Sequence, residues 1–401
     1  MTETATSRVA LPASSERAPA RGPLSLRWVT TTDAFDALGD AWARLHASCD
    51  STAFQSYEWQ RAWWRHFGEG NPRLRLQIGV CERAGEVVAI APFVITRARA
   101  FGLVGLEQLE LLGKGVSDYL DLLVAPGLES GACEMLAEQL TQLRSFEVVS
   151  WVDVPDPSPL KRILLPALRR TGWMGSEEVR EQCPRTALLE TWQATLASFE
   201  DSHRKRVAYL DRKLKKNLAV EVRRAESEPD LDAALDSFIA MHQRRWVSAG
   251  EPGAFADARA VAFHREVARA FQRRGWLSLS FLVLNGRPAT ANYAFKVSGK
   301  LEFYLSGAAD YEEARKFAPG ILLHAYCMQQ MIGEGVRIYD FLRGTERYKY
   351  ELGAKDVANW ALLAFRPGAS ITRLKHRLHV LHRKLGASAK RAMTKVRSGK
   401  A

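Results

Sequence analysis

The feature that most constrains the fold is an order of elements that occurs once in each half of the chain. In "LRLQIGVCERAGEVVAIAPFVI" two apolar runs flank Ala84 and Gly85, and in "WLSLSFLVLNGRPATANYAFKV" two flank Asn285 and Gly286. A two-residue break containing glycine between apolar runs predicts an antiparallel hairpin. Each hairpin precedes a strand-like segment, a helix-like segment that opens with Pro-Gly, and a last strand. This repetition predicts two tandem domains of one kind.

The predicted fold class is α/β (α+β), with a mixed, mostly antiparallel sheet flanked by helices in each domain. The chain has 401 residues, 47% of them hydrophobic, so it is long enough for two domains of ordinary size. We predict a disordered N-terminus at 1–23, a first domain at 24–190, a second domain at 191–365, and a basic amphipathic tail at 366–401.

Several classes of protein lack support in the sequence. The five cysteines are scattered and never spaced as CxxC, and neither a run of eighteen apolar residues nor a signal peptide is present. The motifs GxGxxG, GxxxxGK[ST], HExxH and GxSxG are also missing. We therefore expect a cytoplasmic protein with no metal, and neither a dinucleotide-binding, P-loop, zincin nor α/β-hydrolase site.

The positive charge is concentrated at the C-terminus. The net charge is +12, and residues 357–401 contain eleven Lys and Arg but no Asp or Glu, so we expect no specific nucleic-acid partner for the main body. A second basic segment, 202–217, is interpreted mainly as a solvated helix. In the tail one apolar stripe lies on a basic helix; its residues are Ile371, Leu374, Leu378, Leu381 and Leu385. Three interpretations stay open: packing on the body, dimerisation, and peripheral contact with the inner face of a membrane.

The segment "RKFAPGILLHAY" indicates an anion-binding helix start. Proline suits the first helical turn, and an adjacent glycine lets a ligand approach free N–H groups where the helix dipole favours a pyrophosphate. With the strand before it, this pattern fits a ligand that has a pantetheine arm and a pyrophosphate. The candidate cofactor-binding residues are Arg315, Lys316, Ala318, Pro319, Gly320 and Ser306.

Taken together, these segments resemble the GNAT acyltransferase superfamily. The resemblance is to its double-domain branch, often labelled CelD-like, which is related to the Fem-type aminoacyl transferases of peptidoglycan bridge synthesis. It covers roughly residues 54–365 and rests on "FQSYEWQRAWWRHFG", "LLGKGVSDYLDLLV", "TWQATLASFEDSHRKRV", "HQRRW", "APGILL" and "YDFLRGTERYKYELG". It implies two GNAT-like domains, a degenerate first one and a second one that binds acyl-CoA, with acetyl-CoA or another acyl-CoA as co-substrate. Glu129 at the start of the first helix would oppose a pyrophosphate there.

The resemblance also implies catalytic residues. Lys349 matches the lysine of the YK motif in the Fem-type relatives, where it stabilises charge near the transferred acyl group, and Tyr348 precedes it. The structural alternative for Lys349 is a salt bridge to a neighbouring glutamate. An amine acceptor also needs a base, and Asp118 and Asp121 in "SDYLDLL" are the candidates.

The expected reaction is direct transfer of an acyl group, most simply acetyl, from CoA to an amine of a small molecule or a cell-envelope or polysaccharide precursor; a hydroxyl acceptor stays open. Two alternatives remain: a Fem-like aminoacyl transferase that uses charged tRNA, and a non-catalytic GNAT scaffold. The alternation of Ser117, Tyr119 and Asp121 on one strand face would place them in a shared cleft. The candidate substrate-binding residues are Ser117, Tyr119, His242, Arg245, Trp246, Tyr304, Asp340, Arg343 and Glu346.

Overall fold

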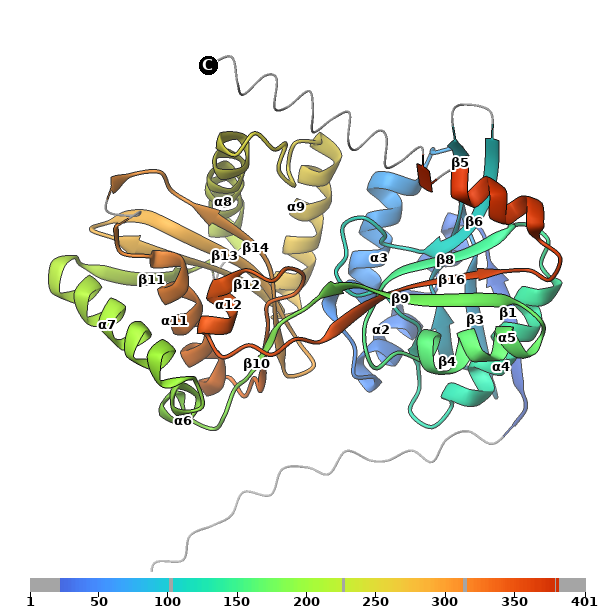
Figure 1. The fold of residues 1–401 in the computed structure, drawn as a ribbon, viewed down its shortest axis with the longest axis horizontal. Coiled ribbons are helices and arrows are strands. Elements are labelled where there is room, and N and C mark those ends of the chain that lie inside the picture. The colour runs from blue at the N-terminus through green and yellow to red at the C-terminus, as the bar shows by residue number, and fades with distance from the viewer. Residues whose placement is uncertain (1–21, 101–103, 226–227, 313–315, 379, 382–401) are drawn as a thin grey trace, which may run out of the picture.

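A computed structural model describes residues 22–100, 104–225, 228–312, 316–378 and 380–381 (Figure 1). Two halves, each built on β-sheet with helices around it, lie side by side. Almost all of the predicted disordered N-terminus lies outside the described residues. Within them, none of the helices has the length and apolarity needed to span a lipid bilayer.

The two predicted hairpins are both present. Ala84 and Gly85 have φ values of 50° and 81°, and Asn285 and Gly286 have φ values of 48° and 78°. Positive φ at both central residues is the geometry of a two-residue turn whose twist matches the strands that it joins. Glycine occupies the second position in each, where a Cβ would be strained.

The first half contains two sheets. A four-stranded sheet has the order β1-β3-β4-β7, and a six-stranded sheet has the order β2-β5-β6-β8-β16-β9. The long hairpin strands are interrupted at Gln77 and at Pro92, and Pro92 has no N–H to donate to the ladder. The first half thus has two sheets where one was predicted. The elements are β1 (Leu24–Val29), α1 (Thr32–Asp36), α2 (Gly39–Ser48), α3 (Tyr57–Trp63), β2 (Leu74–Leu76), β3 (Ile78–Arg83), β4 (Glu86–Ala91), β5 (Phe93–Ala100), β6 (Val104–Leu111), β7 (Leu123–Val124), α4 (Glu129–Gln142), β8 (Val148–Val154), α5 (Leu165–Arg170) and β9 (Met174–Gln182).

The second half is built on one six-stranded sheet of order β10-β15-β14-β13-β12-β11. Helices α8 and α9 cover one face of it, and α7 and α11 cover the other (Figure 1). The elements are β10 (Arg185–Ala187), α6 (Trp192–Ala197), α7 (Asp201–Asn217), β11 (Val220–Arg224), α8 (Glu228–Ser248), α9 (Ala258–Arg273), β12 (Leu277–Leu284), β13 (Arg287–Val297), β14 (Lys300–Ala308), α11 (Pro319–Gly333), β15 (Ile338–Asp340) and α12 (Arg347–Glu351), followed by β16 (Ala358–Phe365) of the first half.

The same strand–helix–strand unit occurs in both halves. Strand β6 leads through α4 to β8, and β14 leads through α11 to β15. In both units the two strands pair in parallel, whereas the other strand pairs of the described sheets are antiparallel. The predicted mixed, mostly antiparallel architecture is confirmed.

Two strands cross between the halves. Strand β10 lies within the predicted first domain but pairs with β15 of the second sheet, and β16 lies within the predicted second domain but pairs with β8 and β9 of the first. The predicted ranges 24–190 and 191–365 do not anticipate this exchange, because the partner of an apolar strand is decided by the sheet edge that it can reach.

A continuous apolar cluster joins the halves. Helix α3 packs against α9, where the rings of Trp59 and Phe263 are 4.9 Å apart and edge-to-face. Trp59 also lies 5.6 Å from Phe295 of β13, between ring centroids. Aromatic pairs of this kind add to the apolar area that they bury. The space between the halves is therefore held in a defined shape.

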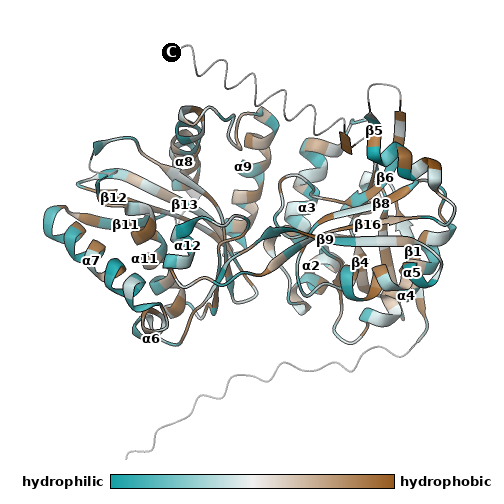
Figure 2. Cartoon of the chain, in the orientation of Figure 1, coloured by the Kyte–Doolittle hydropathy of each residue, from teal (hydrophilic) through white to brown (hydrophobic). Residues whose placement is uncertain are grey.

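The residues on α7 show why a basic segment forms an ordered helix. Val207 and Leu214 are buried and face α11, while the cations point outward. Figure 2 shows α7 as hydrophilic over most of its visible surface. The helix expected at 202–217 is present, and most of its cations are exposed.

Candidate active site

Two neighbouring cavities lie in and beside the second half. The inter-domain cavity, about 470 Å³, lies between the halves, and the helix-start cavity, about 300 Å³, lies beside the beginning of α11. Three residues line both cavities: Arg245, Ser306 and Tyr348. A ligand in one cavity could therefore meet a ligand in the other at these side chains.

The helix-start cavity forms where two parallel strands diverge. Strand β14 pairs with β15 only from Lys300 to Glu302, and then continues to Ala308 while β15 ends at Asp340. The opening between the two strands is lined by β13, β14 and the first turns of α11. An extended chain could lie along the free edge of β14 in this opening.

The first residues of α11 leave space for a ligand. Ala318 precedes the helix in the left-handed conformation (φ 49°, ψ 51°), and Pro319 occupies the first turn. A Cβ added to Gly320 would meet no atom within 4 Å. Ala318, Pro319 and Gly320 all line the cavity. Lys316 is exposed just before this turn, while Arg315 lies outside the described residues.

Side chains from α8 fix the junction of the two cavities. His242 Nδ1 lies 2.8 Å from the Ser306 carbonyl oxygen, and Arg245 donates to Ser306 Oγ at 2.8 Å. The other ring nitrogen of His242 accepts a long bond from the Ala254 N–H, 3.4 Å. Burial lowers the pKa of His242, so the ring is neutral at pH 7. With both nitrogens occupied, His242 positions Ser306 and is not a free base.

Tyr348 forms the other wall of the junction. Its ring stacks on that of His324, with centroids 5.3 Å apart and an interplanar angle of 15°. Burial raises the pKa of Tyr348 above its ordinary value, so it remains a neutral phenol at pH 7. His324 was not a predicted site residue, although its spacing four residues after Gly320 places both on one helix face.

A charged cluster forms the wall opposite α8. Asp118 from the first half pairs with Arg343 Nε from the second, and Arg343 also approaches Asp153, 3.5 Å between Nη1 and Oδ1. Asn359 of β16 donates to the backbone carbonyl of Asp118 at 2.8 Å. Burial raises the pKa of Asp118 to about 6 although Arg343 acts in the opposite direction. Asp118 therefore changes charge close to neutral pH.

Lys349 lies in the wall of the inter-domain cavity with its ammonium group already bound. The ammonium donates to the carbonyls of Arg343 and Gly344, at 2.7 and 3.1 Å, and pairs with Glu346 at 2.9 Å. The Glu346 salt bridge proposed as the structural alternative is therefore present. Because these oxygens occupy its donors, Lys349 is suited to hold the segment after β15 in place.

Comparison with known proteins identifies a family for part of the second half. Residues 201–350 match the family model described as an acetyltransferase (GNAT) domain. The second half of the chain therefore contains a GNAT acetyltransferase domain.

Solved structures resemble most of the chain, beyond the residues that the family model matches. A crystal structure of FemX is 12% identical, with a TM-score of 0.60, over 87% of this chain and 99% of that one. A conserved protein of unknown function from Bacteroides thetaiotaomicron VPI-5482 is 10% identical, with a TM-score of 0.50, over 85% of this chain and 100% of that one. A tandem GNAT protein from the clavulanic acid biosynthesis pathway is 14% identical, with a TM-score of 0.44, over 86% of this chain and 100% of that one. No curated protein matches the chain significantly.

Three predicted site residues, Ser117, Tyr119 and Asp121, line neither cavity, so the shared cleft expected for them is not present. Residues 117–122 do not form a strand, so the expected alternation of side chains does not occur. Instead Ser117 accepts from Trp59 Nε1 (2.8 Å), and Tyr119 donates to Asp340 (3.0 Å). Asp121 binds the Leu122 N–H at 2.8 Å inside the first half.

Asp340 is a structural residue at the domain boundary. Its carboxylate is fully buried and pairs with Arg185 Nε of β10 at 2.5 Å. Together with the Tyr119 hydroxyl, this pair ties the exchanged strand β10 to β15. Asp340 therefore cannot orient an acceptor, because removing a buried charge from its partner is strongly unfavourable.

The other predicted acceptor residues do line the inter-domain cavity. Trp246 packs against His242, with ring centroids 5.9 Å apart, and Tyr304 donates to the Val116 carbonyl at 2.6 Å. The cavity wall also includes Arg343 and the exposed side chain of Glu346. The structure thus brings together Asp118, His242, Arg245, Trp246, Tyr304, Ser306, Arg343, Glu346, Tyr348 and Lys349.

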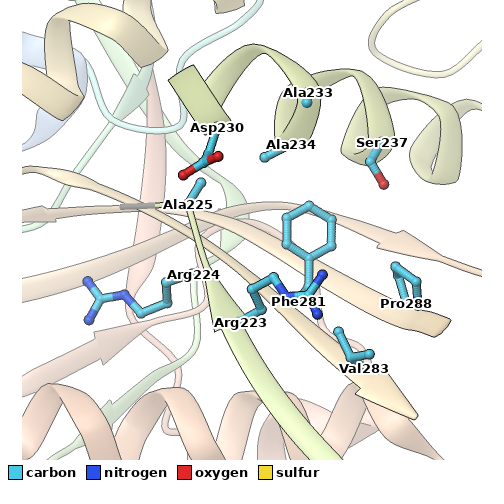
Figure 3. A pocket seen from close by; sticks show the side chains of 10 residues that line it. All are labelled: Arg223, Arg224, Ala225, Asp230, Ala233, Ala234, Ser237, Phe281, Val283 and Pro288. Carbon is cyan, nitrogen blue, oxygen red and sulfur yellow. The ribbon is translucent and has the colours of Figure 1, made fainter. Parts of the chain in front are cut away.

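A third cavity, about 450 Å³, lies between α8 and the β11 edge of the second sheet (Figure 3). Its two arginines are engaged elsewhere: Arg223 contacts Glu221, and Arg224 donates to Glu334 at 2.6 Å. No predicted site residue lines it. Among the described residues, no group of three or more His, Cys, Asp or Glu side chains is placed to hold a metal ion.

Proposed function

We propose that this GNAT protein transfers an acyl group, acetyl in the simplest case, from a CoA thioester to an amine of a small molecule or of a cell-envelope or polysaccharide precursor. The observation that carries the proposal is the pair of cavities that meet at Arg245, Ser306 and Tyr348. One cavity suits a donor and the other an acceptor, and both substrates would be bound when transfer occurs.

The helix-start cavity has the features that a CoA thioester requires. Free N–H groups at the first turn of α11 and the helix dipole favour the pyrophosphate, and Gly320 lets it approach closely. The pantetheine arm would then lie along the free edge of β14, which leads to Ser306 at the junction. The thioester would reach the inter-domain cavity beside Tyr348.

The acceptor would be activated by Asp118. Its raised pKa of about 6 leaves it ionised at neutral pH yet able to take a proton from an ammonium group. An acceptor that arrives as an ammonium would first lose one proton to solvent. Its neutral amine nitrogen would then attack the thioester carbonyl carbon, forming the C–N bond while Asp118 takes the proton that the nitrogen releases. The C–S bond then breaks, and the neutral Tyr348 phenol would donate its proton to the departing thiolate and recover one from solvent.

Lys349 would contribute by position. Its buried ammonium holds the carbonyls of residues 343 and 344, which fixes the segment that carries Arg343 next to Asp118. Lys349 also lines the inter-domain cavity, so its positive charge would stabilise the negative charge that develops on the attacked carbonyl oxygen.

Calorimetric titration with acetyl-CoA and with aminoacyl-tRNA tests the donor. We expect acetyl-CoA to bind in the micromolar range, with CoA binding at the same site. Binding of aminoacyl-tRNA alone would contradict the proposal and favour the Fem-like alternative.

That alternative has a specific observation in its favour. The fold is shared with FemX, and α7 presents exposed cations, including Lys205, Arg212 and Lys216, that could approach a phosphate backbone. Replacing these three by glutamine should leave acetyl-CoA affinity unchanged. A loss of aminoacyl-tRNA affinity with a steep salt dependence would support tRNA as the donor.

We also propose peripheral contact of the tail with an anionic membrane surface. The described part of the tail is helical, and Ile371, Leu374 and Leu381 are 74%, 59% and 50% exposed. Lys375 pairs with Glu147 at 2.7 Å, so the helix contacts the body through its basic face. The stripe is not packed on the body at these three positions, whereas Leu378 is half-buried and Leu385 lies outside the described residues.

Co-sedimentation with phosphatidylglycerol vesicles tests this contact. We expect the full chain to bind and a chain lacking residues 370–401 to lose binding. A variant with Ile371 and Leu374 changed to serine should bind weakly, because its charge is retained while apolar area is lost. Equal binding of all three proteins would refute membrane contact through the tail.

A further inference from the structure

His324 is a buried imidazole that lines the helix-start cavity. It lies on α11 four residues after Gly320, and both residues face the cavity. The first turn of the helix would hold the pyrophosphate, so His324 lies deeper along the same helix face, toward Tyr348. Tyr348, whose ring stacks on that of His324, lines both cavities, and the thioester of the proposed donor would lie beside it.

The partners of His324 determine which ring nitrogen carries the proton. Nδ1 lies 2.7 Å from the Tyr339 hydroxyl and 3.2 Å from Asn292 Nδ2. An amide NH₂ can only donate, and the Tyr339 hydroxyl can donate as well. Nδ1 therefore accepts both bonds, and the proton of the neutral ring resides on Nε2.

The ring is neutral across the physiological range. Burial lowers the pKa of His324 to about 3, and the positive charge of Lys349 acts in the same direction. The ring is also enclosed by aromatic side chains, with the Phe303 ring at 4.5 Å edge-to-face and the Tyr348 ring stacked on its other side. An imidazole in these surroundings donates a hydrogen bond without carrying charge.

Both hydrogen bonds of the ring go to Nδ1, and the Nε2–H group has no hydrogen-bond partner among the described residues. Nε2 is not one of the fully enclosed atoms that lack a partner, so this N–H is open to the cavity that His324 lines. The cavity that His324 lines is the place from which a partner could come.

We propose that the Nε2–H of His324 donates a hydrogen bond to the carbonyl oxygen of the thioester bound in the helix-start cavity, a role that rests on the proposed CoA-dependent function. The bond strengthens as attack by the amine moves negative charge onto that oxygen. No proton is transferred, so His324 remains neutral throughout the reaction.

Two substitutions separate this role from simple packing. Asn at 324 places an oxygen near the position of Nδ1, so H324N can still accept from Tyr339 but has no donor at the Nε2 position. Gln places its amide nitrogen near the position of Nε2, so H324Q keeps the donor and loses the Nδ1 acceptor. If His324 only packs and accepts from Tyr339, H324N should behave like the wild-type protein. If its Nε2–H donates to the thioester, H324Q should behave like the wild-type protein.

Binding of acetyl-CoA and of S-ethyl-CoA, which lacks the carbonyl oxygen, provides a readout that needs no acceptor. We expect the wild-type protein to prefer acetyl-CoA by about three- to tenfold, the effect of one neutral hydrogen bond. H324N should lose most of this preference and H324Q should retain it. CoA itself should bind all three proteins with similar affinity.

The outcomes test the proposed function and the role of His324 separately. If the wild-type protein binds neither acetyl-CoA nor CoA, the proposed function fails. If it binds both but shows no preference over S-ethyl-CoA, or if H324N keeps the preference, only the role of His324 is overturned. Should H324N not fold, the wild-type preference for acetyl-CoA over S-ethyl-CoA still tests the proposal, because its absence would overturn the donor role, and H324Q should retain it.

Discussion

The two copies of the strand–helix–strand unit differ in what occupies the opening between their parallel strands. In the first copy, β6 pairs with β8 at Gln108 and Leu109, and residues 112–122 then fill the space beside β8. There the Leu120 N–H donates to the Asp153 carbonyl at 2.8 Å. In the second copy the corresponding opening, beside β14, is the helix-start cavity.

This difference assigns separate tasks to two units of one topology. The filled opening of the first copy supports the loop that carries Asp118 to the inter-domain cavity. The open one of the second copy offers a helix start without acidic residues in its first turn, whereas α4 begins with Glu129. Acidic charge at a helix N-terminus already satisfies the dipole there, so only the second copy is suited to an anionic donor.

The largest expected effect concerns the filled copy. Replacing Asp118 by Asn should lower kcat about 100-fold, because a general base contributes roughly that much or more. In the wild-type protein, burial raises the pKa of Asp118 to about 6, so activity should rise with pH through about 6 as the carboxyl ionises. This rise of activity with pH should be absent in D118N. Release of CoA thiol from acetyl-CoA, measured from pH 5 to 8 with an amine acceptor, checks both.

Asp121→Asn is the matched control. Asp121 is as deeply buried as Asp118, and burial raises its pKa to about 7, but it lies away from both cavities. We expect D121N to keep wild-type kcat and its pH dependence. If D121N loses the activity and D118N keeps it, the base has been assigned to the wrong carboxylate.

The open copy is tested by filling its opening. Replacing Gly320 by Phe should weaken CoA binding about 30-fold, equivalent to about 2 kcal/mol, because the new ring would occupy the cavity. The substitution should cost little stability, since a Cβ at this position meets no atom within 4 Å. Calorimetric titration with CoA and a thermal melt measure the two effects.

Gly333→Phe provides the control on the same helix. Gly333 ends α11, is exposed, and has equally open space around its Cβ position. CoA affinity should be unchanged in G333F. Equal affinities for G320F and G333F would show that the donor does not enter at the start of α11.

Local patterns were sufficient to predict the repeated unit and the open helix start. The glycine-containing turns at 84–85 and 285–286 and the Pro-Gly pair at 319–320 act within a few residues, so the sequence records them directly. The basic amphipathic character of α7 was readable for the same reason.

Contacts across the domain boundary could not be predicted in this way. The exchange of β10 and β16, the pair of Asp340 with Arg185 and the bond of Tyr119 to Asp340 join residues more than a hundred positions apart. The loop at 117–122 looked like a strand because its polar and apolar residues alternate, but tertiary contacts decide its course. His324 was missed because a histidine in an apolar helix gives no signal until its cavity is known.

A third prediction concerns the segment that joins the open copy to the filled one. Replacing Lys349 by Ala should lower kcat about tenfold, because the carbonyls at 343 and 344 lose their donor and Arg343 shifts relative to Asp118. Arg347→Ala on the same short helix is the control, since Arg347 is exposed and, within the described part of the chain, forms its ion pair with Glu351. Wild-type rates in folded K349A would remove Lys349 from the mechanism.

The smallest expected effect concerns the contact that holds the two copies together. Glu302 of β14 in the open copy accepts from the Ala53 N–H of the first half at 3.0 Å, and burial raises its pKa from 4.5 to about 8. Between these values the folded protein keeps a proton that the unfolded chain has released, so stability must fall as pH rises from about 4.5 to about 8. Gln at 302 keeps a carbonyl acceptor and cannot ionise. E302Q should therefore match the wild-type Tm at pH 5 and exceed it by about 2–4 °C at pH 9; an identical difference at both pH values would mean that Glu302 does not titrate at this contact.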